Sequence, residues 1–450
     1  MPEDPHPAGA GAPPELHPPA PAHIIVVGCH AADLDQLRGR GWQVSLISRR
    51  GSLARLSEEG RALFADIEVL DGSDSGDLGF YENHAVAVIR AAERLAARVG
   101  PPRAVIGLYE HTVLPAARVR QHFGLDGLSV DAALLCRDKV RMKQALAAHG
   151  VRVPLFAEFT SDPDDLAGAE VFVGEVPGRV VVKPRRQAAA RGLHVVESYD
   201  QLCELARREY LQDYEIEEYV EGDIYHVDAV VRDGSIKWIS AGKYVGSCAE
   251  YGAPDAPLAS VVETDPLLVD RIREFARQVV RSLEITDSVI HLELFHVGGG
   301  ELVFLEVGCR SAGGPGTPWM YREMFDVDLV REQILAATGS PTDIDPSRRP
   351  TWDQSAHVGW LMTPAPLPRD GRVVAVHGTS ELPDAVIAAR MPALGSIVAD
   401  SDPVWPNSGV FLLRATNAEE LEAAMAGILH TYRIEVAGSE SRQQSSHVVG

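Results

Sequence analysis

Cysteine is scarce in this sequence, and its few cysteines show no spacing that fits a metal site. The five residues are scattered and odd in number: Cys29, Cys136, Cys203, Cys248 and Cys309. Without a CxxC pair, the sequence gives no sign of a zinc site or of a disulfide framework. We therefore expect reduced, mostly buried thiols, as in cytosolic proteins.

Long apolar runs and an excess of basic charge are also missing. No run approaches the roughly 20 apolar residues that a membrane span needs. Residues 1–22 are rich in Pro and Ala and lack the basic and apolar regions of a signal peptide. The net charge of -22 argues against nucleic acid and against an anionic membrane as partners. We expect a cytoplasmic protein that binds small molecules, with disordered tails at 1–22 and 437–450.

The 450 residues, 45% of them hydrophobic, are enough for about three domains. Short apolar runs at 23–28, 43–48 and 104–109 alternate with helical patterns at 32–40 and 83–99. This alternation predicts an open, Rossmann-like parallel α/β domain over residues 23–130. The first turn, residues 28–32, lacks the GxGxxG fingerprint. An NAD-dependent oxidoreductase is therefore disfavoured.

Residues 131–346 show a different pattern, dominated by hairpins. A helix is predicted over 134–149, with Gly150 just after its end. Strands at 179–183 and 193–196 flank a loop, and hairpins join 227–232 to 236–240 and 289–297 to 301–307. We expect one domain with subdomains at about 131–215 and 216–346. The Pro-rich stretch 348–368 marks a boundary, and 347–436 predicts a small, lid-like α+β domain with a helix over 418–429.

Two lysines and the loop that follows one of them are candidates for phosphate binding. Lys183 ends an apolar strand, where a charge needs an anionic partner, although a lysine at a strand end can also extend to water. Lys139 taken alone fits a solvated helix residue. Residues 185–192 combine arginines with small residues that let a backbone close over phosphate, and a plain surface loop is the competing interpretation.

Two carboxylates lie in apolar strand sequence on either side of one tight hairpin. Glu293 and Glu306 can point at one site, and paired carboxylates repel unless a proton or a metal lies between them. Mg²⁺ suits such a pair together with phosphate oxygens. Arg310 follows and could hold a transferred phosphoryl group. A surface salt bridge is the alternative for these residues.

The order of these motifs resembles the ATP-grasp superfamily, and most closely the bacterial L-amino acid ligases that make dipeptides. The motifs are Asp138-Lys139, 180–184, 217–222, His291-Leu-Glu293 and 306–310, within a resemblance that covers about residues 23–435. The resemblance implies an ADP-forming carbon–nitrogen ligase that uses ATP and one or two Mg²⁺ ions. It also implies an amino acid carboxylate, an amine and a dipeptide-like product, and it favours a homodimer.

The resemblance also implies a role for each candidate residue. Lys139, Lys183 and Arg191 would contact the nucleotide phosphates, and Arg310 and Lys183 would be catalytic. Glu217, Glu218 and Val220 would bind adenine, with Asp223 near the ribose. Glu293 and Glu306 would hold Mg²⁺. The substrate would lie near Glu110, His291, Arg310, Gly313 and Gly314, with 247–258 lining its pocket. Glu110 fits a solvated loop carboxylate equally well.

Three positions depart from the pattern of the family. Ala190 stands where a serine is usual, Gly308 where a metal-binding Asn is frequent, and Ile224 where an acidic residue usually holds the ribose. Two alternatives therefore stay open. One is an ATP-grasp enzyme of another reaction, such as a bicarbonate-activating carboxylase or a nucleotide-biosynthesis ligase. The other is a degenerate protein that binds ATP without turning it over.

Overall fold

A computed structural model describes residues 21–72, 79–160, 163–188, 190–246, 256–345, 356–368, 370–398 and 407–437. Most of both predicted tails, most of the predicted pocket lining at 247–258 and the start of the Pro-rich stretch lie outside these residues. Within the described part of the chain, no helix is long and apolar enough to cross a membrane.

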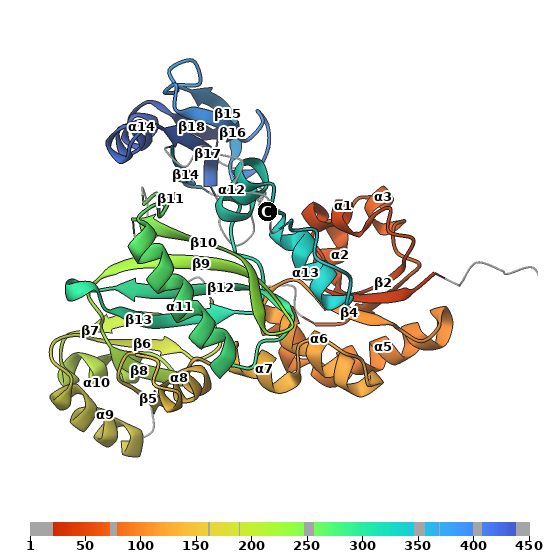
Figure 1. Cartoon of the computed structure of the whole chain (residues 1–450), viewed down its shortest axis with the longest axis horizontal. Helices are drawn as coiled ribbons and strands as arrows, with labels where there is room; N and C mark the ends of the chain where they lie inside the picture. The colour runs from red at the N-terminus through yellow and green to blue at the C-terminus, as the bar shows by residue number, and fades with distance from the viewer. Residues whose placement is uncertain are drawn as a thin grey trace, which may run out of the picture.

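The N-terminal part is an open parallel sheet, as predicted. The strands lie in the order β3-β2-β1-β4 and are all parallel, and helices α5 and α6 pack beside them (Figure 1). The strands are β1 (His23–Val27), β2 (Gln43–Arg49), β3 (Asp66–Leu70) and β4 (Ala104–Gly107). The helices are η1 (Ala31–Asp33), α1 (Leu34–Leu37), α2 (Arg50–Ala54), α3 (Glu58–Arg61), α4 (Phe80–Asn83), α5 (Ala85–Val99) and α6 (Glu110–Phe123).

A distant helix completes the core of this sheet. Ile334 of α13 (Leu329–Ala337) is fully buried among the side chains of β1, β2 and β4. Figure 1 shows α13 beside the N-terminal layer, although it lies more than 200 residues further along the chain. This packing holds the carboxyl ends of β1 and β4 next to the rest of the molecule.

The helix predicted over 134–149 is two helices. α7 (Val130–Leu135) ends at Cys136, and α8 (Lys139–Ala148) begins after Asp138. The carboxylate of Asp138 accepts hydrogen bonds from the backbone N–H groups of Val140 and Arg141 and so caps α8. The apolar periodicity continues across the break, which explains why the prediction joined the two helices. Gly150, with φ 75°, follows α8 as predicted.

A small antiparallel sheet follows, in the order β5-β8-β6-β7. It comprises β5 (Phe156–Phe159), β6 (Val180–Pro184), β7 (His194–Val196) and β8 (Tyr214–Glu218), with helices α9 (Pro163–Glu175) and α10 (Tyr199–Arg208). The two helices cover one face of the sheet, at the lower left of Figure 1. The predicted strands on either side of the loop 185–192 are confirmed as β6 and β7.

The largest sheet has eight strands in the order β13-β12-β9-β10-β11-β14-β17-β16. Both predicted hairpins are present, and the turn between β9 and β10 uses Asp233 at φ 51° and Gly234 at φ 68°. The strands are β9 (Asp223–Arg232), β10 (Ser235–Val245), β11 (Leu258–Val262), β12 (Ser288–His296), β13 (Leu302–Gly308), β14 (His357–Pro364), β16 (Val386–Arg390) and β17 (Asn407–Ala415). Helices α11 (Pro266–Ser282) and α12 (Gly316–Phe325) pack against it, and η2 (Gly298–Gly300) closes one hairpin.

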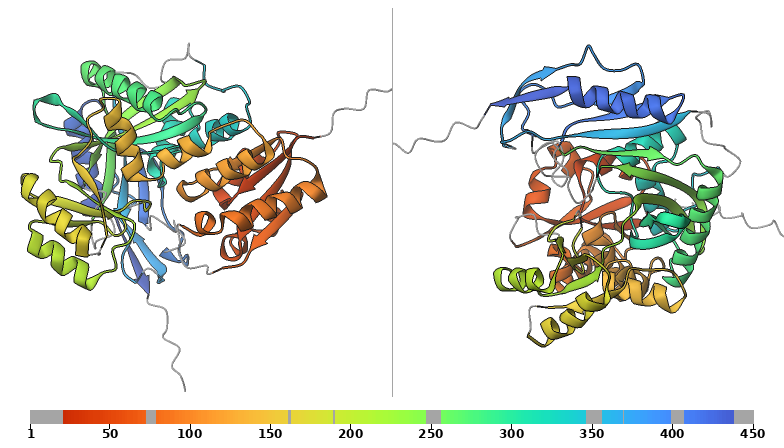
Figure 2. Two further views of the ribbon diagram at one scale, coloured as in Figure 1. Left: turned by 90° about the horizontal axis from the view of Figure 1, so that it is seen from below. Right: turned by 90° about the vertical axis from the view of Figure 1, so that its left-hand side faces the viewer.

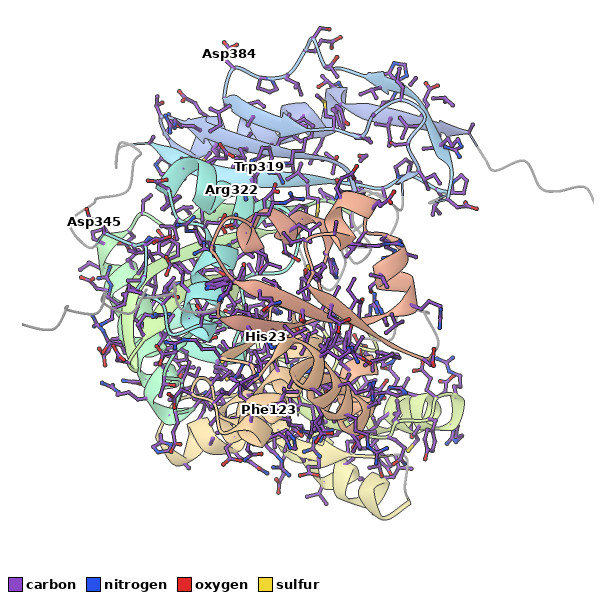
Figure 3. The ribbon with its side chains drawn as sticks, turned by 90° about the vertical axis from the view of Figure 1, so that its right-hand side faces the viewer. His23, Phe123, Trp319, Arg322, Asp345 and Asp384 are labelled. Carbon is purple, nitrogen blue, oxygen red and sulfur yellow. The ribbon has the colours of Figure 1, made fainter. Side chains whose placement is uncertain are left out.

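The stretch predicted as a boundary at 348–368 contains a strand of this sheet. β14 pairs with β11 on one side and with β17 on the other, so the sheet runs without a break into the C-terminal part. β15 (Arg372–His377), β18 (Arg433–Ala437) and α14 (Ala418–Thr431) complete this layer (Figure 2). Figure 3 shows Trp319 and Arg322 of α12 beside the C-terminal strands. The predicted helix at 418–429 is confirmed as α14.

Candidate active site

Glu293 and Glu306 face each other across β12 and β13. The two residues are direct register partners, so their side chains lie on the same face of the sheet. Both are partly shielded, with 15% and 29% of their side chains exposed. Tyr244 of β10 donates a hydrogen bond to Glu293 at 3.1 Å. Two shielded carboxylates on facing residues fit a hard divalent cation such as Mg²⁺.

Lys139 joins this carboxylate pair to the loop at 185–192. Its ammonium group lies 3.0 Å from Glu306 and donates to the backbone carbonyl of Gln187 at 2.7 Å. Burial raises the pKa of Glu306, but Lys139 and Lys183 lower it by more, to about 2. Glu306 is therefore ionised at neutral pH, as a metal-binding carboxylate must be.

Arg310 and Glu110 form an ion pair between distant parts of the chain. Glu110 is the first residue of α6, directly after the loop that follows β4, and Arg310 follows β13. Nε of Arg310 donates to Glu110 at 2.6 Å, and Arg137 approaches the other carboxylate oxygen at 3.6 Å. Burial raises the pKa of Glu110, but Arg310 and Arg137 lower it below its ordinary value. The N-terminal layer thus adds an ionised carboxylate to the site.

Gly308 leaves the space that Glu110 occupies. A Cβ atom at position 308 would lie 2.9 Å from Oε2 of Glu110, closer than such contacts normally are. The frequent Asn of the family would therefore collide with this carboxylate. Gly313 and Gly314 follow in the loop before α12, and Gly314 has a φ of 73° that favours glycine.

Lys183 and Glu217 are joined, together with two residues that the sequence analysis missed. Nζ of Lys183 lies 2.5 Å from Glu217 and 3.8 Å from Glu215. Lys143 of α8 contacts both carboxylates, at 2.8 Å from Glu215 and in a short hydrogen bond to Glu217. Two signals could have revealed these residues: Lys143 lies four positions after Lys139, and Glu215 lies two positions before Glu217 on the same strand face.

His291 belongs to a buried network centred on Asp228. Asp228 lies 2.9 Å from Nδ1 of His291 and 2.7 Å from Nδ1 of His226, and it accepts a hydrogen bond from Tyr321 at 3.0 Å. Burial lowers the pKa of His291, but Asp228 and Glu293 raise it to about 9. The ring is therefore protonated at neutral pH, which does not suit metal binding by these three residues even though their ligand atoms lie within 4.8 Å of one another.

A protein-family comparison identifies the part of the chain that carries this arrangement. Residues 136–314 match the model of the family described as the ATP-grasp domain. This stretch is an ATP-grasp domain. It contains every residue of the cluster described above except Glu110, which the N-terminal layer contributes.

Individual relatives extend the comparison beyond the ATP-grasp domain. The L-arginine-specific L-amino acid ligase of Bacillus subtilis is 28% identical over 248 residues, which are 53% of this chain and 58% of that protein. The chain spans about half the length of the curated relatives it matches.

Solved structures share the fold over nearly the whole chain. The L-amino acid ligase from Bacillus licheniformis aligns with a TM-score of 0.71 and 16% identity, over 93% of this chain and 99% of that one. The biotin carboxylase domain of the Hydrogenobacter thermophilus 2-oxoglutarate carboxylase, in complex with MgADP and bicarbonate, aligns with a TM-score of 0.65 and 16% identity, over 92% and 90%. The three-part architecture is thus the one that ATP-grasp ligases use.

The remaining predicted residues lie along one edge of the ATP-grasp domain. Glu218 accepts hydrogen bonds from Arg152 and from the backbone of Leu155, and Val220 follows the end of β8. Asp223 begins β9 and pairs with Lys243 at 2.7 Å. Arg191 is exposed in the loop 185–192, beside Ala190 with its φ of 53°.

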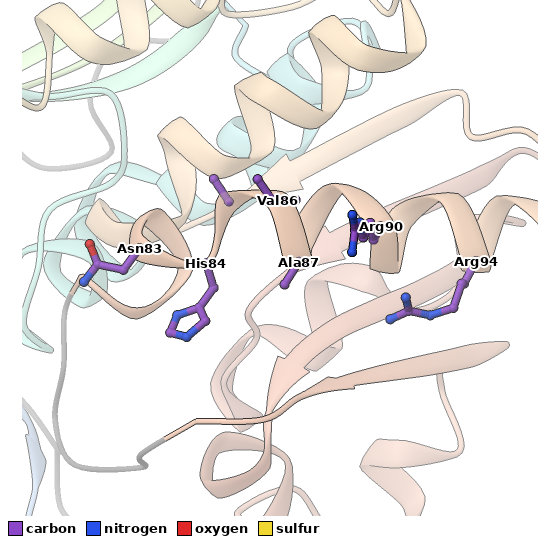
Figure 4. Close-up of a pocket in the computed structure, with 7 residues that line it drawn as sticks. Asn83, His84, Val86, Ala87, Arg90 and Arg94 are labelled. Carbon is purple, nitrogen blue, oxygen red and sulfur yellow. The ribbon is translucent and has the colours of Figure 1, made fainter.

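A separate pocket lies on the N-terminal layer (Figure 4). Its lining residues come from the end of α4 and from α5: Asn83, His84, Ala85, Val86, Ala87, Arg90 and Arg94. None of them is a candidate site residue, and Arg94 is paired with Glu68. We therefore base the function on the charged cluster of the ATP-grasp domain.

Proposed function

We propose that this protein is an ATP-dependent ligase that joins the carboxylate of an amino acid to an amine. The observation that carries the proposal is the facing pair Glu293 and Glu306, with Lys139 on Glu306 and with Arg310 four residues further on. Within an ATP-grasp domain, this set can bind a metal–phosphate group and a reacting carboxylate side by side.

In this proposal each group has a defined task. Lys139 and Lys183 neutralise nucleotide phosphates, with Arg191 approaching them from the loop 185–192. The strand end at Glu217, Glu218 and Val220 binds adenine, and Asp223 lies near the ribose. Glu293 and Glu306 hold Mg²⁺, which would neutralise charge on the phosphate oxygens when bound.

The reaction has two steps. A carboxylate oxygen of the donor attacks the γ-phosphorus of ATP, the bond to the bridging oxygen breaks, and ADP leaves. The amine then attacks the carbonyl carbon of the acyl phosphate, a proton leaves the nitrogen, and phosphate departs. Arg310 and the backbone of Gly313 and Gly314 stabilise the negative oxygen that develops in this second step.

The donor amino acid lies between the two halves of the site. Glu110 binds its ammonium group, because this carboxylate is ionised and reaches the side of the site where Arg310 lies. His291 is protonated and adds positive charge beside Glu293. The name of the Bacillus subtilis relative supports an amino acid as the substrate.

The alternative is an ATP-grasp enzyme that activates another carboxylate. Fold neighbours include a biotin carboxylase domain in complex with bicarbonate. No contact among the described residues favours bicarbonate over an amino acid, whereas the Glu110–Arg310 pair supplies both a cation site and an anion site. We therefore prefer the amino acid.

The test is phosphate release from Mg-ATP with a panel of amino acids, singly and in pairs, combined with mass spectrometry of the products. We expect release that depends on a pair, ADP as the nucleotide product, and a product mass equal to two amino acids minus water. AMP as a product, or a requirement for bicarbonate, would contradict the proposal.

A matched control separates turnover from binding. Glu306→Gln removes the negative charge that holds the metal and keeps the shape of the side chain, so phosphate release should fall by at least about a hundredfold. If the wild-type protein binds ATP but releases no phosphate with any pair, the degenerate alternative gains support.

A further inference from the structure

Four buried charges form a closed cluster below the predicted nucleotide site. Lys143 comes from α8, Lys183 from β6, and Glu215 and Glu217 from β8. Each of these side chains is at most 6% exposed. Two lysines and two glutamates balance in charge, as buried ionic groups must.

The two lysines share the same carboxylates but differ in their position. Lys183 lies 2.5 Å from Glu217, and Lys143 contacts Glu217 as well as Glu215. Burial raises the pKa of Glu217, but Lys143 and Lys183 lower it below its ordinary value. Glu217 therefore stays ionised because two cations hold it.

Lys143 itself is completely buried, and its ammonium group lies 5.1 Å from the centre of the Phe156 ring. Lys139 lies one helical turn away on the same helix and contacts Glu306 instead. α8 thus carries one lysine toward the metal carboxylates and a second toward the strand that the adenine would contact.

We propose that Lys143 is a positioning residue for nucleotide binding, because it holds Glu217 and Glu215 and so lets Lys183 move its ammonium group onto a nucleotide phosphate. The inference rests on the proposed function, in which Lys183 contacts phosphate. In the structure Lys183 is paired with Glu217, and a second cation on Glu217 lowers the cost of weakening that pair.

Charge counting predicts what each substitution does. Lys143→Met leaves one lysine with two carboxylates, so the cluster has a net negative charge beside the nucleotide and Lys183 is held more tightly. Glu215→Gln leaves two lysines with one carboxylate. The double variant has one lysine and one carboxylate and is balanced again.

The experiment measures Mg-ADP binding to the full chain by calorimetry for the wild type, both single variants and the double variant. Lys143→Met should raise Kd by at least about tenfold, and the double variant should return to within about threefold of the wild type. Glu215→Gln alone should bind Mg-ADP at least as tightly as the wild type. Circular dichroism and thermal melting of each variant show whether it is folded.

Rescue by a second charge change separates this role from a packing role, because a lost methylene contact is not restored by neutralising Glu215. An unchanged Kd in Lys143→Met, a double variant as weak as the single one, or weaker binding in Glu215→Gln would each overturn the inference. The last measurement decides even if Lys143→Met does not fold.

The outcome is distinguishable from that of the proposed function. Wild-type binding of Mg-ADP without any pair-dependent phosphate release would reject the ligase reaction and leave the role of Lys143 to be decided by Kd. Absence of Mg-ADP binding by the wild type would overturn both.

Discussion

At the scale of single residues, the site is built from charges whose partners come from other elements. Glu306 is ionised because Lys139 and Lys183 outweigh its burial, and Glu110 is ionised because Arg310 and Arg137 do so. The same physics gives the opposite result at Asp33. Its carboxyl group is buried near Asp328, and burial raises its pKa to about 6, although the backbone N–H of His30 lowers it.

Asp33→Asn should make the protein more stable at neutral pH. The pKa of Asp33 in the folded state lies above its unfolded value of about 3.9. Its contribution to stability is therefore present below about pH 4 and lost as the pH rises through about 6. The variant should gain on the order of 2 kcal/mol in the free energy of unfolding at pH 7.5 and little at pH 4.5.

Urea unfolding of the wild type and the variant across this pH range measures the difference. Asp35→Asn is the control, because Asp35 is exposed two residues further along and should show no such pH dependence. Equal stability of Asp33→Asn and the wild type at all pH values would reject this account of Asp33.

At the scale of elements, the break between α7 and α8 decides where the site lysines point. Asp138 caps α8 and also accepts from Arg185 and Arg186, which begin the loop at 185–192. One carboxylate thus fixes both the start of the helix that carries Lys139 and the base of the loop that covers it. The sequence analysis treated Asp138 only as the neighbour of Lys139.

Asp138→Ala should destabilise the protein by about 3 kcal/mol, because it removes a helix cap and leaves buried arginine charge without its partner. Asp265→Ala, at the exposed N-cap of α11, removes a cap alone and should cost about 1 kcal/mol. Guanidinium unfolding of both variants compares the two. Similar losses would mean that the arginine contacts of Asp138 contribute nothing.

At the scale of the whole molecule, the site joins segments about 200 residues apart. Glu110 from the N-terminal layer meets Arg310 after β13, and α13 packs into the core of that layer. The predicted boundary near residue 348 is bridged by β14, so the C-terminal strands continue the large sheet. Substrate binding is therefore expected to depend on how these layers fit together.

Gly308→Asn should raise the KM for the carboxylate substrate at least about tenfold while Mg-ADP binding stays unchanged. The new side chain would displace Glu110 from Arg310, since its Cβ atom alone would approach the carboxylate to 2.9 Å. Gly298→Asn is the matched control, because no atom lies within 4 Å of a Cβ atom at that end of the same hairpin. Higher activity in Gly308→Asn would indicate that the family Asn is tolerated and useful here.

The sequence by itself determined much of the local structure. Apolar alternation located the parallel strands β1, β2 and β4, Asp233-Gly234 located one hairpin turn, and the position of Glu293 and Glu306 around a tight turn determined that they face each other. These features depend on neighbours that are close in the chain. The order of the motifs also predicted the ATP-grasp fold.

Only the tertiary structure decided which charges meet. The contacts of Lys143 with Glu215 and Glu217, of Asp228 with His226 and His291, and of Glu110 with Arg310 join residues that local patterns treat separately. A charge in an amphipathic or apolar pattern does not reveal its partner, because burial and pairing arise when sheets and helices pack. The pKa values of these groups, and so the chemistry of the site, depend on that packing.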